Sequence, residues 1–175
     1  MEMNILHALQ ELHNPVLDNI MVFITSLGNA GALWIVLSII LMCFKKYRKC
    51  GITMAVALLI FGVFGNVIMK NVFGRPRPCW VDSSVKMLVK IPKDYSFPSG
   101  HTSASFAGAL AIYLYNKKAG IAAFVLASLI AFSRLYLFVH YPSDIAAGVM
   151  IGLLCAAAAF FIVKKIYKKK FEILK

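Results

Sequence analysis

Hydrophobic and polar residues alternate in long blocks along the chain. Polar residues bound four apolar stretches, which cover residues 51–69, 103–115, 119–139 and 145–163. A helix needs about 20 apolar residues to cross a bilayer, and the longer stretches meet that length. The pattern therefore predicts four helices embedded in a membrane.

A further apolar region, residues 16–44, is interrupted near its middle by Gly28-Asn29-Ala30-Gly31. Its length fits either one long tilted helix or two short ones. We favour two helices, broken at Gly28 and Asn29, because adjacent Gly and Asn residues form turns. The prediction is then a bundle of six transmembrane helices.

Residues 1–14 have a different pattern, in which apolar side chains recur at helical spacing between polar ones, at Ile5, Leu6, Leu9 and Leu12. This spacing predicts an amphipathic helix that lies in the membrane interface. No Lys or Arg precedes it, so we do not expect a cleavable signal peptide.

The composition supports a membrane setting. Hydrophobic residues make up 61% of the 175 residues, and the mean hydropathy is +0.78. A soluble globule of this size has too little interior to bury so much apolar surface. We therefore predict an all-α integral membrane protein with a single domain over residues 1–175.

Charge predicts how the bundle is oriented. The net charge is +12, and most of the basic residues lie in three clusters, at residues 45–49, 117–118 and 164–170. The alternation of the helices places these clusters on one face, which the positive-inside rule makes cytoplasmic. Because such clusters anchor helices to anionic lipid, we expect no nucleic-acid partner.

Polar residues of the types that catalyse reactions or bind ligands lie on the opposite face. Lys70, Arg75 and Arg77 stand at the start of the long connection over residues 71–97, and Pro98-Ser99-Gly100-His101 begins the next helix. A helix N-terminus has unpaired N–H groups and binds anions, and Ser99 is a good capping residue. Taken separately, however, snorkelling cations and an ordinary helix start explain both stretches.

Arg134 lies near the end of an apolar helix, where a charge facing lipid costs on the order of 3 kcal/mol. It is therefore expected to point inward. Asp144 opens the last helix and can reach back to His140. A carboxylate bound to one imidazole nitrogen leaves the other free and basic, as a nucleophilic histidine requires.

Together these residues resemble a known family. The motifs are Lys70 with Arg77-Pro78, then Pro98-Ser99-Gly100-His101, then Ser133-Arg134 with His140 and Asp144. This order and spacing is similar to that of the type 2 phosphatidic acid phosphatases, a superfamily shared with vanadium haloperoxidases and acid phosphatases. The resemblance is specific over residues 70–144, whereas residues 1–50 share only the six-helix layout.

The resemblance implies a role for each site residue. His140 would attack phosphorus and become phosphohistidine, Asp144 would orient it, and His101 would protonate the leaving lipid oxygen. The phosphoryl oxygens would be held by Lys70, Arg77, Ser99, Gly100 and Arg134. No cofactor or metal is implied, and the outer face offers few carboxylates to bind one.

The leading hypothesis is a metal-independent lipid phosphate or pyrophosphate phosphatase of the bacterial cell membrane, with its site on the extracytoplasmic side. The preferred substrate is undecaprenyl pyrophosphate, with phosphatidylglycerophosphate and phosphatidate as alternatives. A lipid phosphotransferase would use the same residues. An anion transporter has less use for a His-Asp couple beside a second His, and a vanadate-dependent peroxidase does not need a lipid-embedded scaffold. The sequence gives no indication of oligomeric state.

Overall fold

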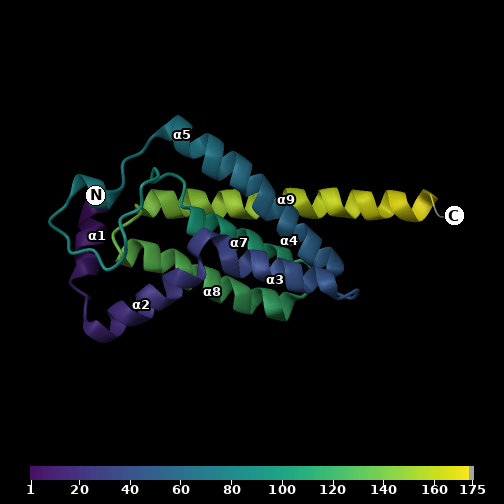
Figure 1. Cartoon of the computed structure of the whole chain (residues 1–175), viewed down its shortest axis with the longest axis horizontal. Coiled ribbons are helices and arrows are strands. Elements are labelled where there is room, and N and C mark those ends of the chain that lie inside the picture. The colour runs from purple at the N-terminus through teal and green to yellow at the C-terminus, as the bar shows by residue number, and fades with distance from the viewer. Residues whose placement is uncertain (174–175) are drawn as a thin grey trace.

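The computed structural model describes residues 1–173, with side chains described through residue 168. Every regular element in this part of the chain is helical (Figure 1). In chain order these elements are α1 (Glu2–Gln10), α2 (Pro15–Leu27), η1 (Asn29–Gly31), α3 (Ala32–Cys43), α4 (Arg48–Phe61), η2 (Gly62–Met69), α5 (Lys70–Phe73), α6 (Pro78–Val81), α7 (Gly100–Tyr113), α8 (Lys117–Tyr136) and α9 (Pro142–Ile173).

Helix α7 lies at the centre of the bundle and packs against α4, α8 and α9. Its buried positions are occupied by small residues, which allow neighbouring helices to approach closely. On α9, a Cβ atom at Gly152 would lie 2.4 Å from the carbonyl oxygen of Ser103, so this contact requires glycine. Small residues therefore allow α7 and α9 to pack closely.

The break predicted in residues 16–44 is confirmed. Helices α2 and α3 are separated by η1, in which Ala30 and Gly31 have positive φ angles of 51° and 67°. The two helices are bent relative to one another by 40°. Turn-forming residues thus end α2 where the sequence predicts it.

Within the described residues, three helical segments are long and apolar enough to cross a membrane, at Arg48–Val81, Lys117–Tyr136 and Pro142–Lys168. The bent pair formed by α2 and α3 gives a fourth candidate if it counts as one span. Helix α7 has 14 residues, fewer than the roughly 20 that a helix needs to cross a bilayer. The membrane-like helical fold is therefore established, whereas the count of six spanning helices stays a prediction.

The helix that leads into the site is wider than an α-helix over η2, which has π-helical hydrogen bonding from Gly62 to Met69. π-Helical segments of this kind often occur at functional sites. The segment ends directly before Lys70, and the helix continues to Phe73, beyond the predicted boundary at residue 69.

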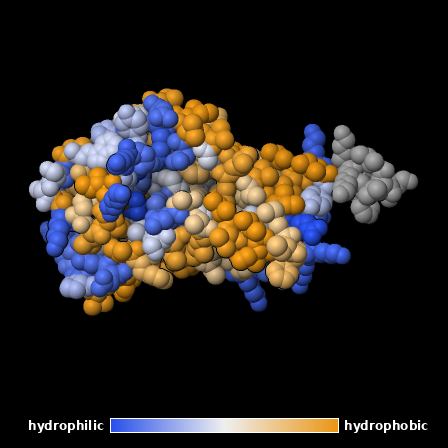
Figure 2. All heavy atoms as spheres, in the orientation of Figure 1, coloured by the Kyte–Doolittle hydropathy of each residue, from blue (hydrophilic) through white to orange (hydrophobic). Residues whose placement is uncertain are grey.

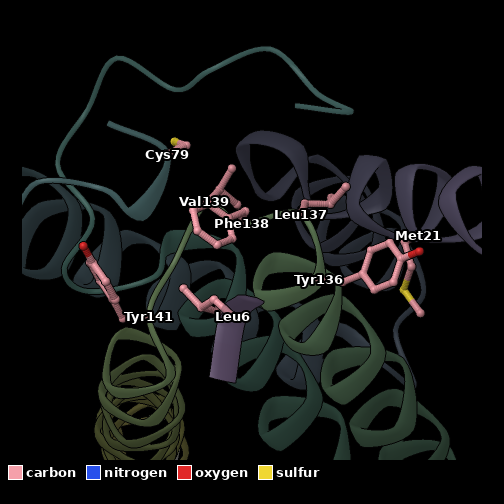
Figure 3. Packing of buried hydrophobic residues seen from close by; sticks show 8 residues of the cluster. All are labelled: Leu6, Met21, Cys79, Tyr136, Leu137, Phe138, Val139 and Tyr141. Atoms are coloured by element: carbon pink, nitrogen blue, oxygen red, sulfur yellow. The ribbon is translucent and has the colours of Figure 1, made fainter. Parts of the chain in front are cut away.

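Helix α8 ends at Tyr136, earlier than the predicted boundary at residue 139. Phe138 follows with a positive φ of 57°, so the chain turns before α9 begins. The apolar residues of this turn are buried by α1, and Figure 3 shows Leu6 close to Phe138, with Tyr136 and Tyr141 on either side. Helix α1 is thus attached to the bundle through Leu6, and its placement in a membrane interface stays a prediction.

The two ends of the bundle differ in character. In Figure 1 the α3–α4 connection, the α7–α8 connection and the C-terminal part of α9 lie at one end, and α1, α5 and the loop before α7 lie at the other. Hydrophilic side chains gather at both ends, with a hydrophobic band between them (Figure 2). The predicted basic clusters and the predicted site are therefore at opposite ends.

Candidate active site

A cavity of about 1090 Å³ opens at the end that carries the predicted site. Figure 2 shows hydrophilic residues around a hollow on this face. Its walls come from α2, η1, η2, α7, α8 and the loop before α7. Six of the predicted site residues line it, namely Lys70, Arg77, Gly100, His101, Arg134 and His140.

His140 and Asp144 form a buried pair at the start of α9. Nδ1 of His140 lies 3.4 Å from Oδ2 of Asp144, as the four-residue spacing predicted. The same oxygen accepts hydrogen bonds from the backbone N–H of Tyr141 at 2.9 Å and from the hydroxyl of Ser96 at 2.5 Å. Asp144 is fully buried behind His140, so the carboxylate lies outside the cavity lining while the imidazole faces it.

His140 is suited to act as a neutral base or nucleophile. Burial, together with the charges of Arg77 and Arg134, lowers the pKa of His140 to about 3 against the opposing effect of Asp144. The carboxylate only accepts hydrogen bonds, so Nδ1 carries the proton and Nε2 carries the lone pair. Nε2 lies 3.1 Å from a terminal guanidinium nitrogen of Arg77.

Lys70 and Arg77 lie on the wall beside His140, and both contact Asp94. The Nζ atom of Lys70 donates to Oδ2 of Asp94, and a terminal nitrogen of Arg77 donates to Oδ1 at 2.9 Å. Burial alone would raise the pKa of Asp94, but the hydrogen bond from Lys70 and the charge of Arg77 outweigh it and lower the pKa to about 2. Asp94 is therefore ionised at neutral pH.

Arg134 points inward from the last turn of α8, as predicted from its position in an apolar helix. One terminal nitrogen donates to the hydroxyl of Thr25 at 2.5 Å. Its Nε atom is buried and has no hydrogen-bond partner among the described residues. A buried N–H without an acceptor is costly.

His101 lies on the first turn of α7, against the turn that follows α2. Its Nε2 atom lies 3.1 Å from Oδ1 of Asn29. A Cβ atom at Gly28 would lie 2.6 Å from the imidazole, so this ring position requires glycine at residue 28. Ser99 caps α7 as predicted, and its hydroxyl faces Thr102 and not the cavity.

Four residues that contact the site residues were not predicted. Asp94 binds Lys70 and Arg77, Ser96 and Arg75 bind Asp144, and Asn29 binds His101. Arg75 lies between Lys70 and Arg77 of the first motif, but the family resemblance implies no role for it. The other partners are contributed by a connecting loop and by a turn, where spacing along the chain gives no indication of contact.

Among the side chains of residues 1–168, no three His, Cys, Asp or Glu gather in an arrangement that could hold a metal ion.

A family model and two named relatives match this chain. A model described as the PAP2 superfamily matches residues 34–168. The chain is 36% identical over 137 residues to a Sulfolobus acidocaldarius protein named undecaprenyl-diphosphatase, covering 78% of this chain and 66% of the relative. It is 34% identical over 153 residues to undecaprenyl-diphosphatase BcrC of Bacillus subtilis, covering 85% of this chain and 76% of the relative.

The fold matches a solved structure as well. The crystal structure of a transmembrane PAP2-type phosphatidylglycerolphosphate phosphatase from Bacillus subtilis superimposes with a TM-score of 0.73 and 27% identity. The match covers 96% of this chain and 85% of that chain.

Proposed function

Since this chain belongs to the PAP2 superfamily, we propose that it is a membrane lipid phosphatase that acts on a phosphate or pyrophosphate head group. The observation that carries the proposal is the position of His140. Its imidazole faces a cavity that is also lined by Lys70, Arg77, Arg134 and His101, and a fully buried Asp144 lies behind it.

The first chemical step would use the lone pair on Nε2 of His140. This pair attacks phosphorus, a nitrogen–phosphorus bond forms, and the bond from phosphorus to the leaving oxygen breaks. His101 donates a proton to that oxygen, and Asp144 stabilises the positive charge that develops on the imidazole of His140. The product of this step is a phosphohistidine enzyme and a released lipid alcohol or lipid phosphate.

The second step would be hydrolysis of the phosphohistidine. The neutral His101 removes a proton from water, the water oxygen attacks phosphorus, and the nitrogen–phosphorus bond breaks to free inorganic phosphate. His101 is then protonated again and His140 neutral, so the two steps balance. A phosphotransferase would differ only in using an acceptor other than water.

Phosphoryl transfer depends mainly on positioning and charge stabilisation. We assign the phosphoryl oxygens to Lys70, Arg77 and Arg134, together with the α7 N-terminus at Gly100, whereas Ser99 caps this helix behind the cavity wall. The burial of Arg134 supports this assignment, because its side chain lines the cavity and its Nε has no acceptor among the described residues. No cofactor is required in this scheme.

The preferred substrate is undecaprenyl pyrophosphate, as the names of the two relatives suggest. The phosphatidylglycerolphosphate phosphatase of matching fold supports phosphatidylglycerophosphate as the alternative, with phosphatidate beside it. A pyrophosphate carries more negative charge than a monoester, and the cavity offers several cations to neutralise it.

The proposal includes a membrane arrangement. A single domain over residues 1–175 would form six transmembrane helices with α1 in the interface of a bacterial cell membrane. The active site would face away from the cytoplasm, since the basic clusters lie at the opposite end of the bundle.

The test is phosphate release by purified protein from a panel of lipid phosphates in the presence of EDTA. We expect turnover of polyprenyl pyrophosphate and its loss in His140→Ala. Activity that requires added magnesium or zinc would contradict the metal-free scheme. Higher kcat/KM for phosphatidate or phosphatidylglycerophosphate would change the substrate and leave the lipid phosphatase class intact.

A further inference from the structure

Asp94 lies where the proposed function requires the phosphoryl group to bind. Its two carboxylate oxygens contact Lys70 and Arg77 separately, so one carboxylate spans both cations. The Asp94 side chain is 52% exposed, whereas those of Lys70 and Arg77 are 6% and 3% exposed. The contact therefore joins a half-exposed residue of a loop to two buried cations in the cavity wall.

The hydrogen bonds of Arg77 show why this contact matters. Its Nε donates to the backbone oxygen of Asp94, and one terminal nitrogen donates to Oδ1 of Asp94 and to the carbonyl of Tyr95. The other terminal nitrogen contacts the carbonyl of Val139 and Nε2 of His140. Every N–H of the guanidinium is thereby directed at an acceptor of the protein.

Arg77 can bind a phosphoryl oxygen only if one of these acceptors gives way. The carbonyl of Val139 and the imidazole of His140 belong to a buried turn. The carboxylate of Asp94 belongs to the irregular loop between α6 and α7, whose residues 88–94 line the cavity. Because this carboxylate already contacts solvent, water can hydrate it when it moves away from the cations.

We propose that Asp94 is a specificity-determining residue, an internal carboxylate that competes with the substrate phosphate for Lys70 and Arg77. The inference rests on the proposed function, because it assumes that these cations hold the phosphoryl group. A phosphate monoester or pyrophosphate dianion has enough charge and acceptors to displace a carboxylate. A phosphodiester of ordinary membrane lipid carries one negative charge and competes poorly.

A purely structural role for Asp94 makes the opposite prediction. If the carboxylate is needed to hold Lys70 and Arg77 in place, its removal weakens anion binding. If it competes with phosphate, its removal strengthens anion binding. The direction of the change in affinity therefore separates the two roles.

The experiment measures binding of inorganic phosphate to purified protein in detergent by titration calorimetry, without any turnover. Asp94→Asn and Asp94→Ala are compared with wild type, and Asp82→Asn serves as the control. Asp82 lies at the start of the same loop and contacts His7 and Ser84 instead of the cavity cations. We expect the two Asp94 variants to bind phosphate about tenfold more tightly and the control to match wild type.

A second measurement tests selectivity on the same proteins. The Asp94 variants should be inhibited more strongly by a phosphodiester phospholipid that is added to a lipid phosphate assay. Phosphate binding that is unchanged, weaker or undetectable in both Asp94 variants would overturn the inference. Failure of the wild type to hydrolyse any lipid phosphate would instead overturn the proposed function, and the calorimetric comparison would still report on Asp94.

Discussion

A guanidinium nitrogen of Arg75 lies 2.7 Å from Oδ1 of Asp144, the carboxylate oxygen that does not contact His140. The same nitrogen donates to the hydroxyl of Ser143, and the other terminal nitrogen donates to Glu2 on α1. Arg75 thereby fixes the orientation of the carboxylate that lies behind the proposed nucleophile. This contact gives a role to a residue that the sequence motif left unassigned.

Loss of the Arg75 guanidinium should reduce catalysis more than substrate binding. We expect Arg75→Gln to lower kcat by about 10- to 100-fold with a smaller change in KM, because a hydrogen bond to a buried charge is lost. Arg75→Lys keeps a donor and should recover part of the rate. Steady-state kinetics on all three proteins measures the effect, and a rise in KM at unchanged kcat would show that Arg75 binds substrate instead.

Protonation of His140 should destabilise the fold at acidic pH. Burial lowers the pKa of this residue from its ordinary value of 6.5 to about 3. Between these values the unfolded chain binds a proton that the folded chain does not. The stability that His140 contributes is complete above pH 6.5 and is lost as pH falls towards 3.

Thermal unfolding in detergent between about pH 7 and pH 4 measures this contribution. We expect Tm to fall with decreasing pH in the wild type and to fall less in His140→Gln. Equal slopes in wild type and His140→Gln would mean that the fold does not lower the pKa of His140.

The orientation of the bundle can be tested by cysteine labelling. The native Cys79 is buried and is a poor probe, although it lies at the site end of the bundle. Single cysteines at two exposed positions, Ser83→Cys and Lys118→Cys in a background without native cysteines, are better placed. In intact cells an impermeant reagent should label position 83, and position 118 only after lysis. The reverse pattern would place the active site on the cytoplasmic side.

How far the sequence predicted the fold differs between elements. The break between α2 and α3 was predictable because Gly28 and Asn29 are local turn formers. The end of α8 was not, because residues 137–139 are apolar although they form a buried turn under Leu6. Hydropathy does not distinguish a side chain that faces lipid from one that is buried in protein.

The site likewise contains residues that local motifs predict and contacts that they do not. Lys70, Arg77, Arg134 and His140 were predicted from local motifs and line one cavity. The contacts of Asp94 and Arg75 depend on the path of a loop and on α1, so spacing along the chain does not reveal them. Sequence motifs thus indicated the reacting groups, and the structure adds the residues that hold or compete for them.

The central claim is that His140 forms a covalent bond to phosphorus, and trapping of the phosphorylated enzyme tests it most directly. Protein is mixed with radiolabelled substrate, quenched rapidly, and examined for acid-labile phosphate. We expect labelled protein in the wild type and none in His140→Ala. His101→Ala should still label with an aryl phosphate, whose leaving group needs little protonation. Labelled protein that persists in His140→Ala would contradict the assignment of His140 as the nucleophile.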